Sequence, residues 1–138
     1  MIESVTKKEF QVPSDLSEVQ KASTRALSFF KPLGLTDALL FDIRLCLEEA
    51  LINAMKYGNN LQYGLPVLVA VEYSGERIQI AVEDQGKGFD PKLLKDCTSR
   101  ENLLRNRGRG VYLIHQLMDR VHYSSRGNRL VMVKFLKK

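Results

Sequence analysis

Two pairs of alternating, β-branched segments constrain the fold of this chain more than any other feature of its sequence. Residues 67–73 and 77–83 alternate in polarity on either side of a short Ser-Gly-Glu link, a pattern that predicts a β-hairpin. Residues 121–125 and 130–136 repeat this arrangement around a link that contains Arg-Gly-Asn. Hairpins pair strands antiparallel, and such sheets commonly have one face that packs on a core.

Helical patterns lie outside these hairpins. Apolar residues recur every three to four positions over residues 16–30 and again over residues 36–57, which predicts two amphipathic helices. A weaker strand pattern precedes them at residues 5–12, and a short helix is expected at about residues 110–118. Strands grouped in hairpins with separate helices indicate an α+β fold, with a mixed or antiparallel sheet and the helices on one face.

The length and charge of the chain narrow the classes of function. Its 138 residues suit one domain, so we expect a single domain over residues 1–138. The formal net charge of +5 is unevenly distributed, because residues 1–94 carry 10 basic and 13 acidic side chains and residues 95–138 carry 11 and three. The basic part has neither an aromatic platform nor a recognition-helix pattern. We therefore expect loop cations and solvated surface charge there, without direct nucleic-acid binding.

The cysteines and the chain's hydropathy indicate the compartment. Cys46 and Cys97 form no CxxC pair and have no nearby histidine, which argues against a disulfide scaffold or a zinc site. The N-terminus lacks the apolar stretch of a signal peptide, and no window approaches the roughly 18 apolar residues of a membrane helix. We expect a cytoplasmic protein without a membrane partner.

The second helix carries the first candidate site. Asp42, Glu49, Asn53 and Lys56 are spaced so that they share one side of the helix, apart from its apolar face. An asparagine oxygen suits a Mg²⁺ ion that also binds phosphate and water, and Glu49 could accept a proton from a hydroxyl. Glu48 is offset by about 100°, so the role is assigned to Glu49. The alternative is a solvated polar stripe.

A glycine-rich segment at the end of the strand over residues 77–83 is the second candidate. Asp84 could accept a hydrogen bond from an exocyclic amine such as that of adenine, and Gly86 and Gly88 let backbone approach a ligand closely. The alternative is a tight turn in which the aspartate bonds its own backbone.

The third candidate is the Arg-Gly-Arg-Gly-Val segment over residues 107–111, at the end of a long irregular stretch. Gly108, Arg109 and Gly110 lead into the expected helix, where free N–H groups and the helix dipole favour a phosphate. Long irregular segments in compact domains often act as lids. The segment is not a Walker A motif, and the alternative is a helix-entry loop with solvated arginines.

Taken together, the three motifs resemble the Bergerat ATP-binding fold of gyrase-type ATPases, heat-shock chaperones, mismatch-repair ATPases and histidine kinases. Residues 48–59 (EEALINAMKYGN), 82–90 (VEDQGKGFD) and 101–119 (ENLLRNRGRGVYLIHQLMD) look most like the small anti-sigma-factor serine/threonine kinases. The resemblance covers nearly the whole chain and implies a Bergerat-type two-layer sandwich.

The resemblance also implies roles for individual residues. Asn53 would ligate the Mg²⁺ that bridges the phosphates of ATP, and Glu49 would orient and deprotonate a serine or threonine hydroxyl on a partner. Asp84 would bind the adenine amine, with Gly86 and Gly88 shaping the pocket. The residues expected near the phosphates are Lys56, Arg105, Arg107, Gly108, Arg109, Gly110 and Val111.

The same family implies the partners. Its members bind a sigma factor, phosphorylate a small STAS-domain anti-anti-sigma protein and commonly form homodimers. This chain departs from the family pattern twice: Tyr57 stands where a histidine is frequent, and residues 127–130 lack the threonine often found in the last strand. The adenine contact is therefore expected to be made differently.

Two alternatives within this resemblance remain. One is a non-catalytic, ATP-dependent binding switch. The other is the catalytic domain of a histidine kinase, which needs an acceptor histidine on a preceding helical segment. This alternative is weaker because the two histidines, His115 and His122, both follow the expected lid.

Overall fold

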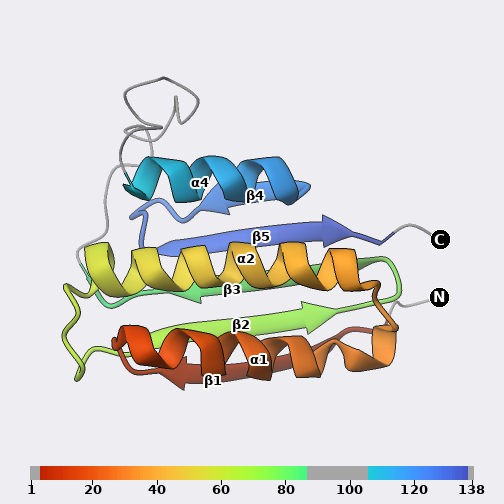
Figure 1. Cartoon of the computed structure of the whole chain (residues 1–138), viewed down its shortest axis with the longest axis horizontal. Helices are drawn as coiled ribbons and strands as arrows, with labels where there is room; N and C mark the ends of the chain where they lie inside the picture. The colour runs from red at the N-terminus through yellow and green to blue at the C-terminus, as the bar shows by residue number, and fades with distance from the viewer. Residues whose placement is uncertain (1–3, 87–105, 137–138) are drawn as a thin grey trace.

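The computed structural model describes residues 4–86 and 106–136, which form two layers (Figure 1). Three helices, α1 (Val19–Phe29), α2 (Asp37–Asn53) and α4 (Asn106–Leu117), lie over one face of a sheet, with α2 between the other two. None of the helices in these two stretches is both long and apolar enough to cross a membrane. The predicted α+β architecture, with helices on one face, is confirmed.

The sheet has five strands, in the order β1-β2-β3-β5-β4, and every neighbouring pair is antiparallel. The strands are β1 (Thr6–Val12), β2 (Val67–Tyr73), β3 (Arg77–Glu83), β4 (Arg120–Tyr123) and β5 (Arg129–Phe135). Both predicted hairpins are present. The β3–β5 pair joins them, and its register opposes Glu83 to Arg129. Consequently the residue after β3 lies beside the turn that precedes β5.

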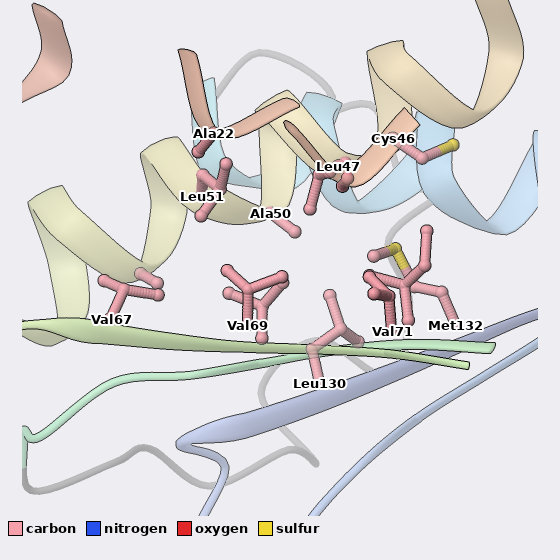
Figure 2. Close-up of a cluster of buried hydrophobic side chains, with 14 of the residues drawn as sticks. Ala22, Cys46, Leu47, Ala50, Leu51, Val67, Val69, Val71, Leu130 and Met132 are labelled. Carbon is pink, nitrogen blue, oxygen red and sulfur yellow. The ribbon is translucent and has the colours of Figure 1, made fainter. Parts of the chain in front are cut away.

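The hydrophobic core fills the space between the helices and the sheet. Figure 2 shows side chains of α1 and α2 above those of β2 and β5. Leu47 and Leu51 of α2 and Val69 of β2 are fully buried. Burying each large aliphatic side chain contributes about 1.5–3 kcal/mol, so this face fixes the rotation of α2 about its axis. The side of α2 that carries Glu49 and Asn53 thereby faces α4, where Gly110 lies beside both side chains.

The ends of α2 follow local sequence signals. Thr36 caps its N-terminus, where its hydroxyl accepts a hydrogen bond from the N–H of Leu39 at 3.2 Å. At the other end the helix widens into a π-helical turn over Ala54–Gly58. Asn60 and Leu61 then take left-handed backbone conformations, with φ of 52° and 56°. Wider turns of this kind are frequent at functional sites.

The start of α4 differs from the prediction. The helix begins at Asn106, so Gly108 and Gly110 lie within its first turns and not in a loop before it. Glycine disfavours helix interiors by only about 1 kcal/mol, and the burial of Val111 and Ile114 offsets such a cost. Most of the predicted lid, over residues 87–105, lies outside the described residues.

Cys46 provides a test of the core. It is 1% exposed, and burial together with the negative charge of Asp42 raises the pKa of its thiol to about 12. At pH 8 only about one thiol in 10⁴ would be ionised, so we expect no alkylation by iodoacetamide in the folded protein. Mass spectrometry should detect modified Cys46 only after unfolding in guanidinium chloride. Rapid labelling of the folded protein at this position would contradict the buried placement.

Candidate active site

A cavity of about 300 Å³ opens at the C-terminal end of α2. One side of α2 and the facing side of α4 line it, with Glu49, Ile52, Asn53, Lys56, Tyr57, Gly110 and Leu113. The predicted stripe of Glu49, Asn53 and Lys56 therefore lies in one cavity. Asp42, two turns earlier, is not among the lining residues. The wall combines a carboxylate, an amide and a cation, a set that could act on a phosphorylated ligand.

The two adjacent acids of α2 point to different neighbours. Glu48 accepts a hydrogen bond from the hydroxyl of Ser23 in α1 at 2.5 Å, and its carboxylate lies 3.4 Å from Nη1 of Arg44. Glu49 instead lines the cavity. The 100° offset between consecutive helical residues accounts for this separation. Glu48 thus joins α1 to α2, and Glu49 is the acid that a ligand in the cavity would meet.

Gly110 packs directly against this wall. A Cβ atom at this position would lie 2.6 Å from Oε2 of Glu49 and 3.4 Å from Nδ2 of Asn53. A side chain at this position would therefore force the Glu49 carboxylate to move. Val111 follows it and is 1% exposed, so this turn is anchored in the core. Arg107, Gly108 and Arg109 contribute helical backbone to α4, whereas Gly88 and Arg105 lie outside the described residues.

A second, narrower cavity of about 20 Å³ adjoins the first at Asn53. Its lining is mostly apolar and comprises Ala50, Asn53, Ala54, Val82, Asp84, Tyr123, Gly127, Asn128 and Leu130. Asp84 is the one acid in this lining and is 8% exposed. Because Asn53 lines both spaces, they are two compartments of one candidate site, one narrow and largely apolar and one polar.

Hydrogen bonds fix the backbone around Asp84. Its N–H donates to the carbonyl of Asn128 at 2.9 Å, and Nδ2 of Asn128 donates to the carbonyl of Asp84 at 3.2 Å. The N–H of Gln85 donates to Oδ1 of Asn59 at 2.7 Å, and the N–H of Gly86 donates to Oδ1 of Asp84 at 2.9 Å. The self-bonded turn predicted as an alternative is therefore present, and Asp84 lines the cavity as well.

Some residues that build the site were not identified as site residues from the sequence. Gly58 directly follows the helix predicted over residues 36–57, and a Cβ atom there would overlap the carboxylate of Asp84. A Cβ atom on Gly86 would overlap the carbonyl of Gly58. Asn59 and Asn128 also support the site, through the bonds to Gln85 and Asp84. Gly-Asn is a turn signal in sequence, and such a signal does not say which distant segment the turn will contact.

The donor set is compatible with a metal ion carried by a ligand. Residues 4–86 and 106–136 contain no group of three histidine, cysteine, aspartate or glutamate side chains that could hold a metal. Asn53 presents a neutral amide in the polar cavity, next to Glu49. Mg²⁺ usually keeps several waters and binds few protein ligands together with phosphate oxygens. The described residues therefore fit an ion that arrives with a phosphorylated ligand.

Gly58 and Gly64 form a matched pair for testing the narrow cavity. The methyl group of Gly58→Ala would displace the Asp84 carboxylate, so we expect adenine-nucleotide affinity to fall at least about tenfold, as for a lost bond to a charged group. Gly64→Ala adds its methyl in open space and should leave affinity unchanged. Displacement of a fluorescent ATP analogue measures both variants. Equal affinities would refute a ligand-binding role for the Asp84 carboxylate.

Comparison with known proteins identifies the family of the chain. A sequence model of the histidine kinase-like ATPase domain matches residues 12–134. Proteins named serine-protein kinase RsbW, from Staphylococcus epidermidis and from Staphylococcus aureus strain MSSA476, are each 30% identical to the chain. Each alignment spans 139 residues, 94% of this chain and 87% of the relative. The chain therefore belongs to the histidine kinase-like ATPase family and is related to the RsbW serine-protein kinases.

Proposed function

We propose that this protein is an ATP-dependent serine/threonine kinase that acts as an anti-sigma regulator. The observation that carries the proposal is the shared wall formed by Asn53, which joins a narrow cavity containing Asp84 to a polar cavity containing Glu49 and Lys56. A nucleotide needs a place for its base beside a place for its phosphates. At about 20 Å³ the narrow cavity has room for about one water molecule, so it must widen to accept a purine. The name serine-protein kinase, carried by the relatives, supports a hydroxyl group as the phosphate acceptor.

In this proposal the narrow cavity binds the base and the polar cavity binds the phosphates. Asp84 accepts a hydrogen bond from the adenine amine, with Gly86 and Gly88 at the pocket floor. Asn53 ligates Mg²⁺, which supplies charge neutralisation to the triphosphate. The residues assigned to the phosphate side are Lys56, Arg105, Arg107, Gly108, Arg109, Gly110 and Val111.

The proposed reaction moves the terminal phosphoryl group of ATP to a protein hydroxyl. The hydroxyl oxygen bonds to the γ-phosphorus as the bond from that phosphorus to the β–γ bridging oxygen breaks, and ADP leaves. Glu49 accepts the hydroxyl proton, which is general base catalysis. Positioning and charge neutralisation supply most of the acceleration in such transfers. Lys56, on the same cavity wall as Glu49, suits the second role.

The biological setting is proposed from the family. The acceptor is a small STAS-domain anti-anti-sigma protein, and the kinase also binds a sigma factor. We further propose that residues 1–138 act as one ATPase domain that forms a homodimer in the cytoplasm, without direct contact with nucleic acid or membrane. Partner switching would follow because phosphorylation adds charge to the acceptor surface.

A non-catalytic ATP-dependent switch is the second candidate. It would use the same two cavities and would need no general base. The histidine-kinase alternative has less support, because His115 lies on α4 and His122 on β4, both after the segment over residues 108–110, and neither lies on a helical segment that precedes the ATP-site motifs.

Glu49→Gln distinguishes a kinase from a switch. Removing a general base should lower phosphate transfer from [γ-³²P]ATP to a small STAS-domain acceptor protein by about 10²–10⁴-fold, with ATP affinity nearly kept. Glu48→Gln is the matched control, since Glu48 faces Ser23 and Arg44, and it should retain turnover. Absence of label transfer by the unaltered protein would refute the kinase. Normal regulation by Glu49→Gln would favour the switch.

A further inference from the structure

Two asparagine side chains from distant parts of the chain bind the same peptide, the one that joins Asp84 to Gln85. Asn59 follows the π-helical turn at the end of α2, and Asn128 lies in the turn between β4 and β5. Oδ1 of Asn59 accepts a hydrogen bond from the N–H of Gln85, and Nδ2 of Asn128 donates a hydrogen bond to the carbonyl of Asp84. The residue at the bottom of the narrow cavity is therefore held from two directions.

Asn59 has only one orientation that satisfies its surroundings. It is 1% exposed, and its Nδ2 donates to the carbonyl of Leu65 at 2.8 Å and to the hydroxyl of Ser14 at 3.0 Å. Its Oδ1 accepts the N–H of Gln85 at 2.7 Å. Rotating the amide by 180° would set an N–H group against the N–H of Gln85 and leave buried donors unpaired. Asn59 thus fixes the position of the Gln85 peptide.

Asn128 is held in a similar way. Its Oδ1 accepts a hydrogen bond from the hydroxyl of Ser124 at 3.2 Å, which directs its Nδ2 to the carbonyl of Asp84 at 3.2 Å. Its own carbonyl accepts the N–H of Asp84 at 2.9 Å. Asn128 also lines the narrow cavity. Side chain and backbone together tie Asp84 to the turn before β5.

The carboxylate of Asp84 is confined as a result. Its Oδ1 accepts the N–H of Gly86 at 2.9 Å, and the backbone of Gly58 packs so closely against the side chain that a Cβ atom there would overlap it. A shift of the peptide before or after Asp84 would move the carboxylate relative to the cavity. The direction of this acceptor therefore depends on Asn59 and Asn128.

A fixed carboxylate discriminates between purines by the group at position 6. Adenine carries an amine there, which donates a hydrogen bond, whereas hypoxanthine carries a carbonyl, which accepts one. A site that presents an immobile acceptor excludes the carbonyl, because two acceptors would face each other without a proton. If the carboxylate can move aside, the loss of binding free energy for hypoxanthine becomes smaller. The binding free energy that adenine gains from its hydrogen bond becomes smaller as well.

We propose that Asn59 and Asn128 are positioning residues that aim the Asp84 carboxylate and thereby set the preference for a 6-amino purine over a 6-oxo purine. The inference rests on the proposed binding of adenine by Asp84. It adds that the selectivity depends on two amides that act through the backbone. Their removal should therefore change the ratio of affinities for the two bases and not only the stability of the fold.

The test measures the dissociation constants of Mg-ATP and Mg-ITP by calorimetry on the full chain. The variants are Asn128→Ala, Asn59→Ala and, as a control, Ser14→Ala. The control removes one partner of Asn59 but keeps its bond to Gln85. Thermal unfolding of each variant is followed separately. Because Asn128 is only half-buried, its alanine variant is the one expected to fold readily and decides the question if Asn59→Ala does not fold.

We expect the unaltered protein to bind Mg-ATP at least about tenfold more tightly than Mg-ITP, as one bond to a charged group would provide. In Asn128→Ala and Asn59→Ala this ratio should fall about five- to tenfold, mainly through weaker ATP binding. Ser14→Ala should melt earlier and keep the ratio. An unchanged ratio in folded Asn128→Ala would overturn the inference and leave the proposed kinase intact. Failure of the unaltered protein to bind either nucleotide would overturn both.

Discussion

The packing of α2 on the sheet is the interaction on which the rest of this structure depends. Leu47 and Leu51 are fully buried against the strands, and this burial sets both the height and the rotation of the helix. Glu49 and Asn53 lie on the same helix, so the packing of its apolar face also sets the directions of these two side chains. If α2 rotated about its axis, several large aliphatic side chains would become exposed to solvent. Each exposure would cost about 1.5–3 kcal/mol of folding free energy.

Antiparallel pairing supplies the second half of the site. The register of β3 with β5 sets Glu83 opposite Arg129, so Asp84 must emerge beside the turn that contains Asn128. Close packing then joins the two halves. Gly58 packs against Asp84 at the end of α2, and Gly110 packs against Glu49 from α4, and an added Cβ atom at either position would displace the neighbouring carboxylate. The site is thus built from four segments whose spacing is limited by glycines.

The basic side chains of the C-terminal third have different partners in the folded chain. Nζ of Lys134 lies 3.7 Å from the carboxylate of Asp119, and Nη1 of Arg129 lies 3.3 Å from that of Glu83. Arg126 instead donates to the carbonyl of Gly86 at 3.3 Å, at the glycine-rich turn after Asp84. These described cations are therefore divided between surface ion pairs and the edge of the candidate site.

Local sequence patterns were sufficient to predict most of the helices and strands. The strands β2 and β3 match their predicted bounds, because alternation and a short turn are properties of adjacent residues. The start of α4 was predicted four residues too late. Its glycines read locally as a loop, whereas the burial of Val111 and Ile114 is a tertiary effect. Asp84 and Glu49 were predicted as candidates from their motifs, and the contacts that hold Asp84 were not.

The sequence by itself determined the α+β class, the two hairpins and the candidate polar residues, since periodicity and residue chemistry are local. Tertiary structure decided which of these residues meet. It placed Glu48 against Ser23 of α1, and it brought Asn59 and Asn128 to opposite sides of one peptide. The physical reason is that long-range neighbours are set by burial and strand register, which depend on the whole chain at once.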